Sequence, residues 1–129
     1  MALPVCRRLS AADQNSFNDL FEGEPFPIEQ PGAQRYGAFE VATLVAAVGI
    51  GQGHDGDLVL FDLFVKPTAR GRGVASCLVN WLKEKICDEA PAIRLTVRGD
   101  NHQAMRLYQR TGFQVIQRNN KDLVMRCRF

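Results

Sequence analysis

The sequence lacks any apolar run long enough to span a bilayer. Its longest apolar stretch, Leu44 to Ile50, is far shorter than the roughly 20 residues that a membrane-spanning helix needs. The first residues also lack the apolar core of a secretory signal peptide. We therefore expect a cytoplasmic location and no membrane partner.

Cysteine is scarce and widely spaced. The four cysteines form no Cys-x-x-Cys pair, which argues against a zinc site and against a disulfide framework. No spacing of histidine, cysteine and carboxylate residues is typical of metal ligands, so no metal is expected. We interpret the four cysteines as buried or free thiols: Cys6, Cys77, Cys87 and Cys127.

Basic residues are rare in the first half of the chain. Residues 1–64 contain three basic and nine acidic residues, whereas residues 65–129 contain thirteen basic and five acidic ones. The second half is therefore suited to binding an anion and the first half to attracting a cation. Charges scattered over solvated surfaces explain the same counts equally well. The length of 129 residues predicts a single domain over 1–129.

Hydrophobic periodicity predicts an α/β (α+β) fold with the element order βαβββαβαββ and a mixed sheet with helices on its faces. The segment 57–65 is apolar on both faces except at two aspartates, as in a central strand. A helix is expected to begin at Ser10, and two more are expected over 71–87 and 101–111. The other strands are expected at 5–9, 36–39, 43–50, 92–97, 113–117 and 123–127.

A glycine-rich segment at Gly51–Gly56 fits the G-x-G-x-x-G pattern of dinucleotide-binding loops. Such a loop must open a helix, because the helix N-terminus faces the pyrophosphate. Here the next segment is the apolar strand that starts near Leu58. We therefore interpret Gly51–Gly56 as a hairpin loop.

A second glycine-rich segment, Lys66–Ala75, leaves the central strand and enters an amphipathic helix. Its glycines allow a tight turn in which successive N–H groups point at one spot, and the helix N-terminus adds about half a positive charge. Arg70 and Arg72 add positive charge at the same place. The segment is suited to a phosphate or diphosphate, and a plain strand-to-helix turn is the alternative.

Two segments together resemble a known family. They are Asp62-Leu63-Phe64-Val65-x-Pro67-x-x-Arg70-Gly71-x-Gly73-Val74-Ala75 and Asn101-x-x-Ala104-x-x-x-Tyr108-x-x-x-Gly112-Phe113. They are similar to the Q/R-x-x-G-x-G/A coenzyme A loop and the following motif of the GNAT superfamily of acyl-CoA-dependent N-acyltransferases. The resemblance is strong over 57–118 and only topological over 1–50. It implies one GNAT-like domain, with a mixed, mostly antiparallel sheet of six to seven strands, helices on both faces and central strands that diverge to form a coenzyme A notch.

The resemblance also implies which residues bind the acyl donor. Backbone groups of Leu63 and Val65 would pair with the pantetheine arm, and the N–H groups from Arg70 to Ala75 would hold the diphosphate. Asn101 would reach the pantetheine region, act as a helix N-cap, or do both. The full set of expected cofactor-binding residues is Leu63, Phe64, Val65, Arg70, Gly71, Arg72, Gly73, Val74, Ala75, Asn101 and Ala104.

Two catalytic residues are expected. Tyr108 holds the family's general-acid position and would protonate the departing thiolate, with simple ring packing as the alternative. Asp62 is the candidate general base, because burial in the central strand would raise its pKa. A structural bond from Asp62 to a loop N–H is an equal alternative. His54 and His102 are less favoured proton relays.

The implied function is transfer of an acetyl group from acetyl-CoA to a primary amine, by direct attack in a ternary complex. Glu22, Glu24 and Glu29 would meet a cationic acceptor or merely be solvated. A non-catalytic module that binds or senses acyl-CoA is the alternative function. Nucleic-acid binding is not expected, because no aromatic residue interleaves Arg70–Gly73. A homodimer is compatible with the sequence.

Overall fold

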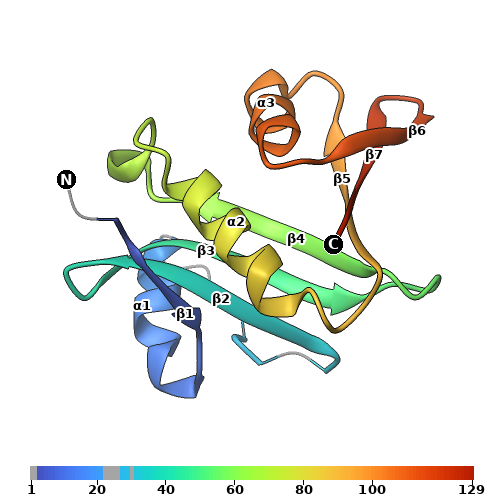
Figure 1. The fold of residues 1–129 in the computed structure, drawn as a ribbon. Helices are drawn as coiled ribbons and strands as arrows, with labels where there is room; N and C mark the ends of the chain where they lie inside the picture. Colours follow the sequence, from blue (N-terminus) through green and yellow to red (C-terminus); the bar gives the residue numbers. More distant parts are fainter. Residues whose placement is uncertain (1–2, 22–26, 30) are drawn as a thin grey trace.

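A computed structural model describes residues 3–21, 27–29 and 31–129. The described chain forms one seven-stranded sheet with the strand order β1-β2-β3-β4-β5-β7-β6 (Figure 1). The strands are β1 (Val5–Arg8), β2 (Ala33–Glu40), β3 (Thr43–Gln52), β4 (Leu58–Val65), β5 (Ala92–Arg98), β6 (Gln114–Asn119) and β7 (Asp122–Arg128). The helices are α1 (Gln14–Leu20), α2 (Val74–Ile86) and α3 (His102–Arg110), with short 3-10 turns at Ala11–Asp13 and Pro67–Ala69.

The centre of the sheet is split. All neighbouring strands pair antiparallel except β4 and β5, which run parallel. Within the described residues, β4 and β5 pair only at Leu58 with Ile93 and at Val59 with Arg94. Beyond these pairs the two strands separate, and β5 continues its pairing with β7 alone. The predicted mixed sheet with diverging central strands is confirmed.

Apolar cores lie on both faces of the sheet. α2 and α3 cover one face, where Leu78, Leu82 and Ile86 are completely buried at the four-residue spacing of one helix side. α1 covers the other face through Phe17 and Leu20. Figure 1 shows α1 behind the strands and α2 in front of them. The prediction of helices on both faces is confirmed.

The second helix begins later than predicted. Helix was expected from Gly71, but α2 starts at Val74. Gly71 and Gly73 have φ angles of +79° and +78°, which a right-handed helix does not allow. The glycines therefore shape a loop that ends directly at the first turn of α2.

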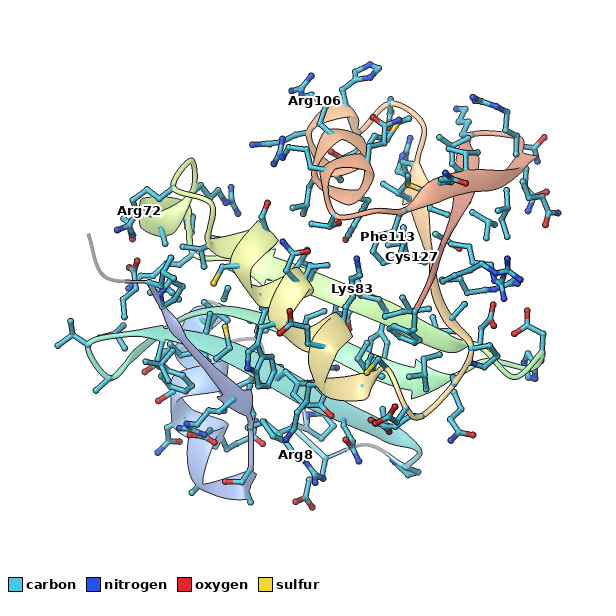
Figure 2. All side chains as sticks on the ribbon, viewed as in Figure 1. Arg8, Arg72, Lys83, Arg106, Phe113 and Cys127 are labelled. Atoms are coloured by element: carbon cyan, nitrogen blue, oxygen red, sulfur yellow. The ribbon has the colours of Figure 1, made fainter. Side chains whose placement is uncertain are left out.

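The third helix has the predicted caps. Asn101 Oδ1 accepts a hydrogen bond from the Ala104 N–H at 3.1 Å, and Gly112 follows the helix with a φ of +100°. Lys83 of α2 donates from its amine to the Thr111 carbonyl. Figure 2 shows Lys83 reaching from α2 toward the end of α3. These contacts fix the end of α3 against α2.

A buried aspartate joins the two halves of the sheet at the start of β4. Asp57 is 4% exposed and accepts hydrogen bonds from Arg94 Nε at 3.0 Å and Arg126 Nε at 2.8 Å. The two guanidinium groups lower the pKa of Asp57. β4, β5 and β7 are thus linked where the central strands still pair. The predicted Gly51–Gly56 loop is shorter than expected, because Gly51 and Gln52 end β3 and residues 53–57 form the β3–β4 connection.

Candidate active site

A cavity of about 490 Å³ opens where β4 and β5 have separated. Its walls come from the end of β4, the loop and first turn of α2, and one side of α3. All the predicted site residues except Asp62 and Arg72 line it. The complete lining is Leu63, Phe64, Val65, Ala69, Arg70, Gly71, Gly73, Val74, Ala75, Ser76, Asn101, Gln103, Ala104, Leu107, Tyr108 and Arg110.

Five lining residues were not predicted from the sequence: Ala69, Ser76, Gln103, Leu107 and Arg110. Helical spacing gave a usable signal for one of them. Leu107 lies three residues after Ala104, so both residues share a side of α3 with Tyr108. In contrast, β5 contributes no residue to the lining, and α3 forms the wall opposite β4.

The end of β4 turns backbone polar groups toward this cavity. The Lys66 N–H donates to the Val45 carbonyl of β3 at 2.8 Å. Because consecutive residues of a strand point their backbone groups to opposite edges, Val65 directs its own N–H and C=O away from β3. That edge faces the cavity, since Val65 lines it. Val65 therefore offers the pairing groups that an extended ligand in the notch needs.

The glycine loop forms an open cradle at Gly71 and Gly73. A Cβ atom placed on Gly71 or Gly73 would meet no other atom within 4 Å, so the space above both backbones is open. Both glycines line the cavity, and α2 begins at the next residue, Val74. Exposed N–H groups at a helix N-terminus favour negative charge. The open space beside Gly71 and Gly73 therefore suits an anion.

Arg70 contacts the end of β4 at the cavity. Its Nε donates to the Val65 carbonyl at 2.9 Å, and its guanidinium carbon lies 5.4 Å from the centroid of the Phe64 ring. All three residues line the cavity. Arg70 thus brings the predicted positive charge to the site, and it occupies the polar edge of β4.

The Arg72 side chain does not lie where it was predicted. It does not line the cavity but forms a 2.8 Å ion pair with Glu40 at the end of β2. Figure 2 shows Arg72 at the loop before α2, on the side away from α3. Arg70 contacts Val65 instead, and the left-handed Gly71 lies between the two arginines. The expectation that both guanidinium groups face one mouth is wrong.

Tyr108 lies in the cavity wall and is 7% exposed. Burial raises its pKa to about 12. Its ring also packs edge to face on Phe113, with 5.6 Å between the ring centroids. The ring packing that was the alternative to a general-acid role is therefore present, and the same side chain also lines the cavity.

Asp62 is not buried, contrary to prediction. It lies where the register of β4 against β3 shifts, and its φ angle is +53°. Such a bulge takes a side chain out of the regular alternation of a strand. The Asp62 side chain is 53% exposed and lies outside the cavity lining. The expected burial of Asp62 in the central strand is therefore wrong.

Arg35 of β2 is the partner of Asp62. Arg35 Nη2 lies 3.4 Å from Asp62 Oδ2, and the Arg35 side chain is only 1% exposed. Its guanidinium carbon lies 5.2 Å from the ring centroids of both Phe17 and Phe61. Within the described residues, its Nε has no hydrogen-bond partner. Sequence reasoning missed Arg35, because one arginine in a strand shows nothing about its partner.

The remaining candidates are spread more widely. Asn101 both caps α3 and lines the cavity, and Ala104 lines it one turn later. His54 and His102 are exposed and outside the lining. Glu29 is exposed, while Glu22 and Glu24 lie outside the described residues.

Three further observations concern metal ligands, membrane-spanning helices and the cysteines. No group of three or more histidine, cysteine or carboxylate residues is arranged to hold a metal ion in this part of the chain. None of the described helices combines the length and apolarity that crossing a membrane requires. The four cysteines are free thiols.

Known structures share this fold. The chain superimposes on the ribosomal-protein-S18-alanine N-acetyltransferase of Escherichia coli with a TM-score of 0.82, at 16% identity, covering 98% of this chain and 94% of that one. It superimposes on the PaiA N-acetyltransferase of Thermoplasma acidophilum, solved with coenzyme A, with a TM-score of 0.79, at 17% identity, covering both chains completely. The fold is that of the GNAT acetyltransferases.

Sequence comparison identifies the family to which the chain belongs. The profile described as the acetyltransferase (GNAT) family matches residues 5–113, so the chain belongs to this family. A curated relative, acetyltransferase SG1711 of Sodalis glossinidius, is 38% identical over 64 residues. That match covers 49% of this chain and 44% of the relative, so the chain matches less than half of that protein's length.

Proposed function

We propose that this chain is an acetyl-CoA-dependent N-acetyltransferase, formed by one domain over 1–129, that acetylates a primary amine by direct attack in a ternary complex. One observation carries the proposal. A single cavity brings together the polar edge of β4, the open cradle at Gly71 and Gly73, and the buried hydroxyl-bearing ring of Tyr108. This combination suits a donor that has an extended arm, a diphosphate and a departing thiolate.

The donor would bind along two elements. The diphosphate would accept hydrogen bonds from the loop N–H groups between Arg70 and Ala75, which lead into α2. The pantetheine arm would run along the Val65 edge of β4 as an added strand. Asn101 and Ala104 would contact the arm from α3, since both line the opposite wall.

The proposed reaction requires a proton for the departing thiolate and a hydrogen bond to the thioester oxygen. Acetyl-CoA would supply the thioester carbonyl carbon that the amine attacks. A backbone N–H near Leu63 would stabilise the oxygen on which negative charge develops. Tyr108 would donate its proton to the departing sulfur, whose thiol has an ordinary pKa of about 8.5. Because burial raises the Tyr108 pKa to about 12, the phenol keeps this proton at neutral pH.

The acceptor amine must lose a proton. An amine with a pKa of about 10.4 is neutral in only about one molecule in 2,500 at pH 7, which costs about 4.6 kcal/mol. The half-exposed carboxylate of Asp62 would accept this proton, directly or through water, while Arg35 holds the carboxylate in place. The acidic excess of residues 1–64 favours a cationic acceptor.

The test is an assay of free thiol release from acetyl-CoA with a panel of amines. A peptide with an N-terminal alanine, spermidine, a free amino acid and an amino sugar represent the acceptor classes. We expect release that depends on one class of amine, and mass spectrometry should show the acetylated product. If coenzyme A binds but no amine accelerates release, the chain is the non-catalytic acyl-CoA-binding module instead. If coenzyme A does not bind, both functions are wrong.

A further inference from the structure

We infer that Arg70 is a donor-specificity residue: it occupies the pantetheine-pairing carbonyl of Val65 until a diphosphate draws it away. This inference rests on the proposed coenzyme A site. It means that donors with a diphosphate open the notch for their own pantetheine arm. Donors without a diphosphate must displace Arg70 with no compensation.

The end of β4 presents the Val65 carbonyl on its free edge. Val65 directs its carbonyl away from β3, because its neighbour Lys66 donates to the Val45 carbonyl. The free edge of β4 faces the cavity, and no β5 residue covers it there. The carbonyl that an added strand would use is therefore the one that accepts the Arg70 Nε hydrogen bond at 2.9 Å.

Arg70 is placed to exchange this partner for a phosphate. Its bond to Val65 is the one hydrogen bond that the described residues give its side chain. It directly precedes Gly71 and lines the same cavity as the glycine cradle. A guanidinium can donate two parallel hydrogen bonds to the charged oxygens of a phosphate, whereas Arg70 donates a single bond to the neutral Val65 carbonyl. A bound diphosphate therefore competes successfully for Arg70.

Pantetheine alone has no such advantage. To pair with Val65, its amide must replace a guanidinium that already satisfies the carbonyl, and the Phe64 stacking contact at 5.4 Å is disturbed as well. Removing the guanidinium should therefore have opposite effects on the two ligands. Coenzyme A loses a phosphate partner, whereas pantetheine loses a competitor.

The experiment measures dissociation constants of coenzyme A and of pantetheine for the wild-type chain, Arg70→Met and Arg106→Met. Methionine keeps an unbranched side chain but cannot donate a hydrogen bond. Arg106→Met is the matched control, because it removes the same charge from an exposed residue of α3 outside the cavity lining. Thermal unfolding of each variant reports whether it is folded.

We expect Arg70→Met to bind coenzyme A about tenfold or more weakly and pantetheine about three- to tenfold more tightly. Arg106→Met should change neither constant by more than about twofold. If Arg70→Met binds pantetheine no better than the wild type, or not at all at millimolar concentration, the inference is overturned. The Val65 carbonyl would then accept both bonds through its two lone pairs. If the wild type does not bind coenzyme A, the proposed function itself fails.

Discussion

Asp62 and Arg35 form an ion pair across β3, with 3.4 Å between carboxylate oxygen and guanidinium nitrogen. The Asp62 carboxylate is half exposed, whereas the Arg35 guanidinium is almost completely buried. An exposed carboxylate usually rotates freely. This one is tied to a guanidinium that is itself fixed near the rings of Phe17 and Phe61. In the proposed function, Arg35 would therefore act on the acceptor only through the position of Asp62.

The first prediction concerns this pair. Asp62→Asn should lower kcat at least about 100-fold, because the amide cannot take the amine proton, while the coenzyme A dissociation constant stays within about twofold. Arg35→Met should lower kcat less. In the Asp62→Asn background, Arg35→Met should cause no further loss, since it acts through Asp62. Steady-state kinetics with the best amine of the panel measure kcat for the wild type, the two single variants and the double variant. If the losses in kcat are additive in free energy, Arg35 does not act through Asp62.

The second prediction concerns Tyr108. Tyr108→Phe keeps the ring that packs on Phe113 and removes only the hydroxyl. It should lower kcat by about 100- to 10,000-fold and leave coenzyme A affinity nearly intact. An unchanged kcat, with the chemical step shown to be rate-limiting, would assign the proton to water or to the substrate.

The pKa of Tyr108 gives a matching pH test. In the folded chain this pKa is about 12, against about 10 for an unfolded tyrosine. Activity should therefore show no loss from Tyr108 ionisation below about pH 10. The unfolded chain releases this proton first, so the free energy of unfolding should fall as pH rises above about 10, as chemical denaturation at several pH values would show. Tyr108→Phe should reduce that alkaline loss.

The third prediction concerns the cradle. Gly73→Glu should abolish coenzyme A binding, because the side chain fills the open space and repels the diphosphate. Gly56→Glu is the matched control. Gly56 also has a positive φ and open space, but it lies in the β3–β4 connection, outside the cavity lining. Both variants carry similar backbone strain, and calorimetric titration should show normal binding only for Gly56→Glu. Normal binding by folded Gly73→Glu would place the anion site elsewhere.

The fourth prediction concerns acid stability. The pKa of Asp57 is lowered by Arg126 and Arg94, and the pKa of Asp13 is lowered to about 2 by Arg7. Unfolded aspartates titrate near 3.9, so the stability from these pairs is present above about pH 4 and is lost as pH falls through the folded-state values. The free energy of unfolding should therefore drop steeply between about pH 4 and pH 2.

A variant isolates the buried pair. Asp57→Asn should destabilise the chain by about 2 kcal/mol at pH 7, because two guanidinium groups lose their carboxylate. It should also flatten the acid dependence. Asp100→Asn, which removes the exposed partner of Arg98, should cost less than about 0.5 kcal/mol. Equal effects of the two substitutions in urea denaturation would contradict this role of Asp57.

Local sequence signals were sufficient for the element order and for the glycine loop, and the family resemblance supplied the other predicted residues of the cavity. The alternation of glycines and the following apolar periodicity located the cradle and α2, and Asn101 with Gly112 marked the ends of α3. Such features depend on neighbours within a few residues. The start of α2 was misplaced, because the pattern alone did not show that Gly71 and Gly73 both take left-handed conformations.

Contacts between distant segments could not be predicted in this way. Asp62 was expected to be buried because it lies in an apolar strand, yet a bulge against β3 exposes it. Arg70 and Arg72 are two residues apart, but one reaches Val65 and the other Glu40, 32 residues away. These partners depend on the register of strands and on left-handed turns. Sequence periodicity reports neither.

The split between β4 and β5 has a consequence for how the molecule responds to its ligand. The two halves of the sheet are joined by the short β4–β5 pairing near Asp57, and β4 and β5 are unpaired along the cavity. A pantetheine arm paired with Val65 would close part of that opening, so that the ligand supplies a missing strand of the architecture. Amide groups on the free edge of β4 would then change from rapid to slow exchange with deuterated solvent. Binding would also make the two halves unfold as one cooperative unit.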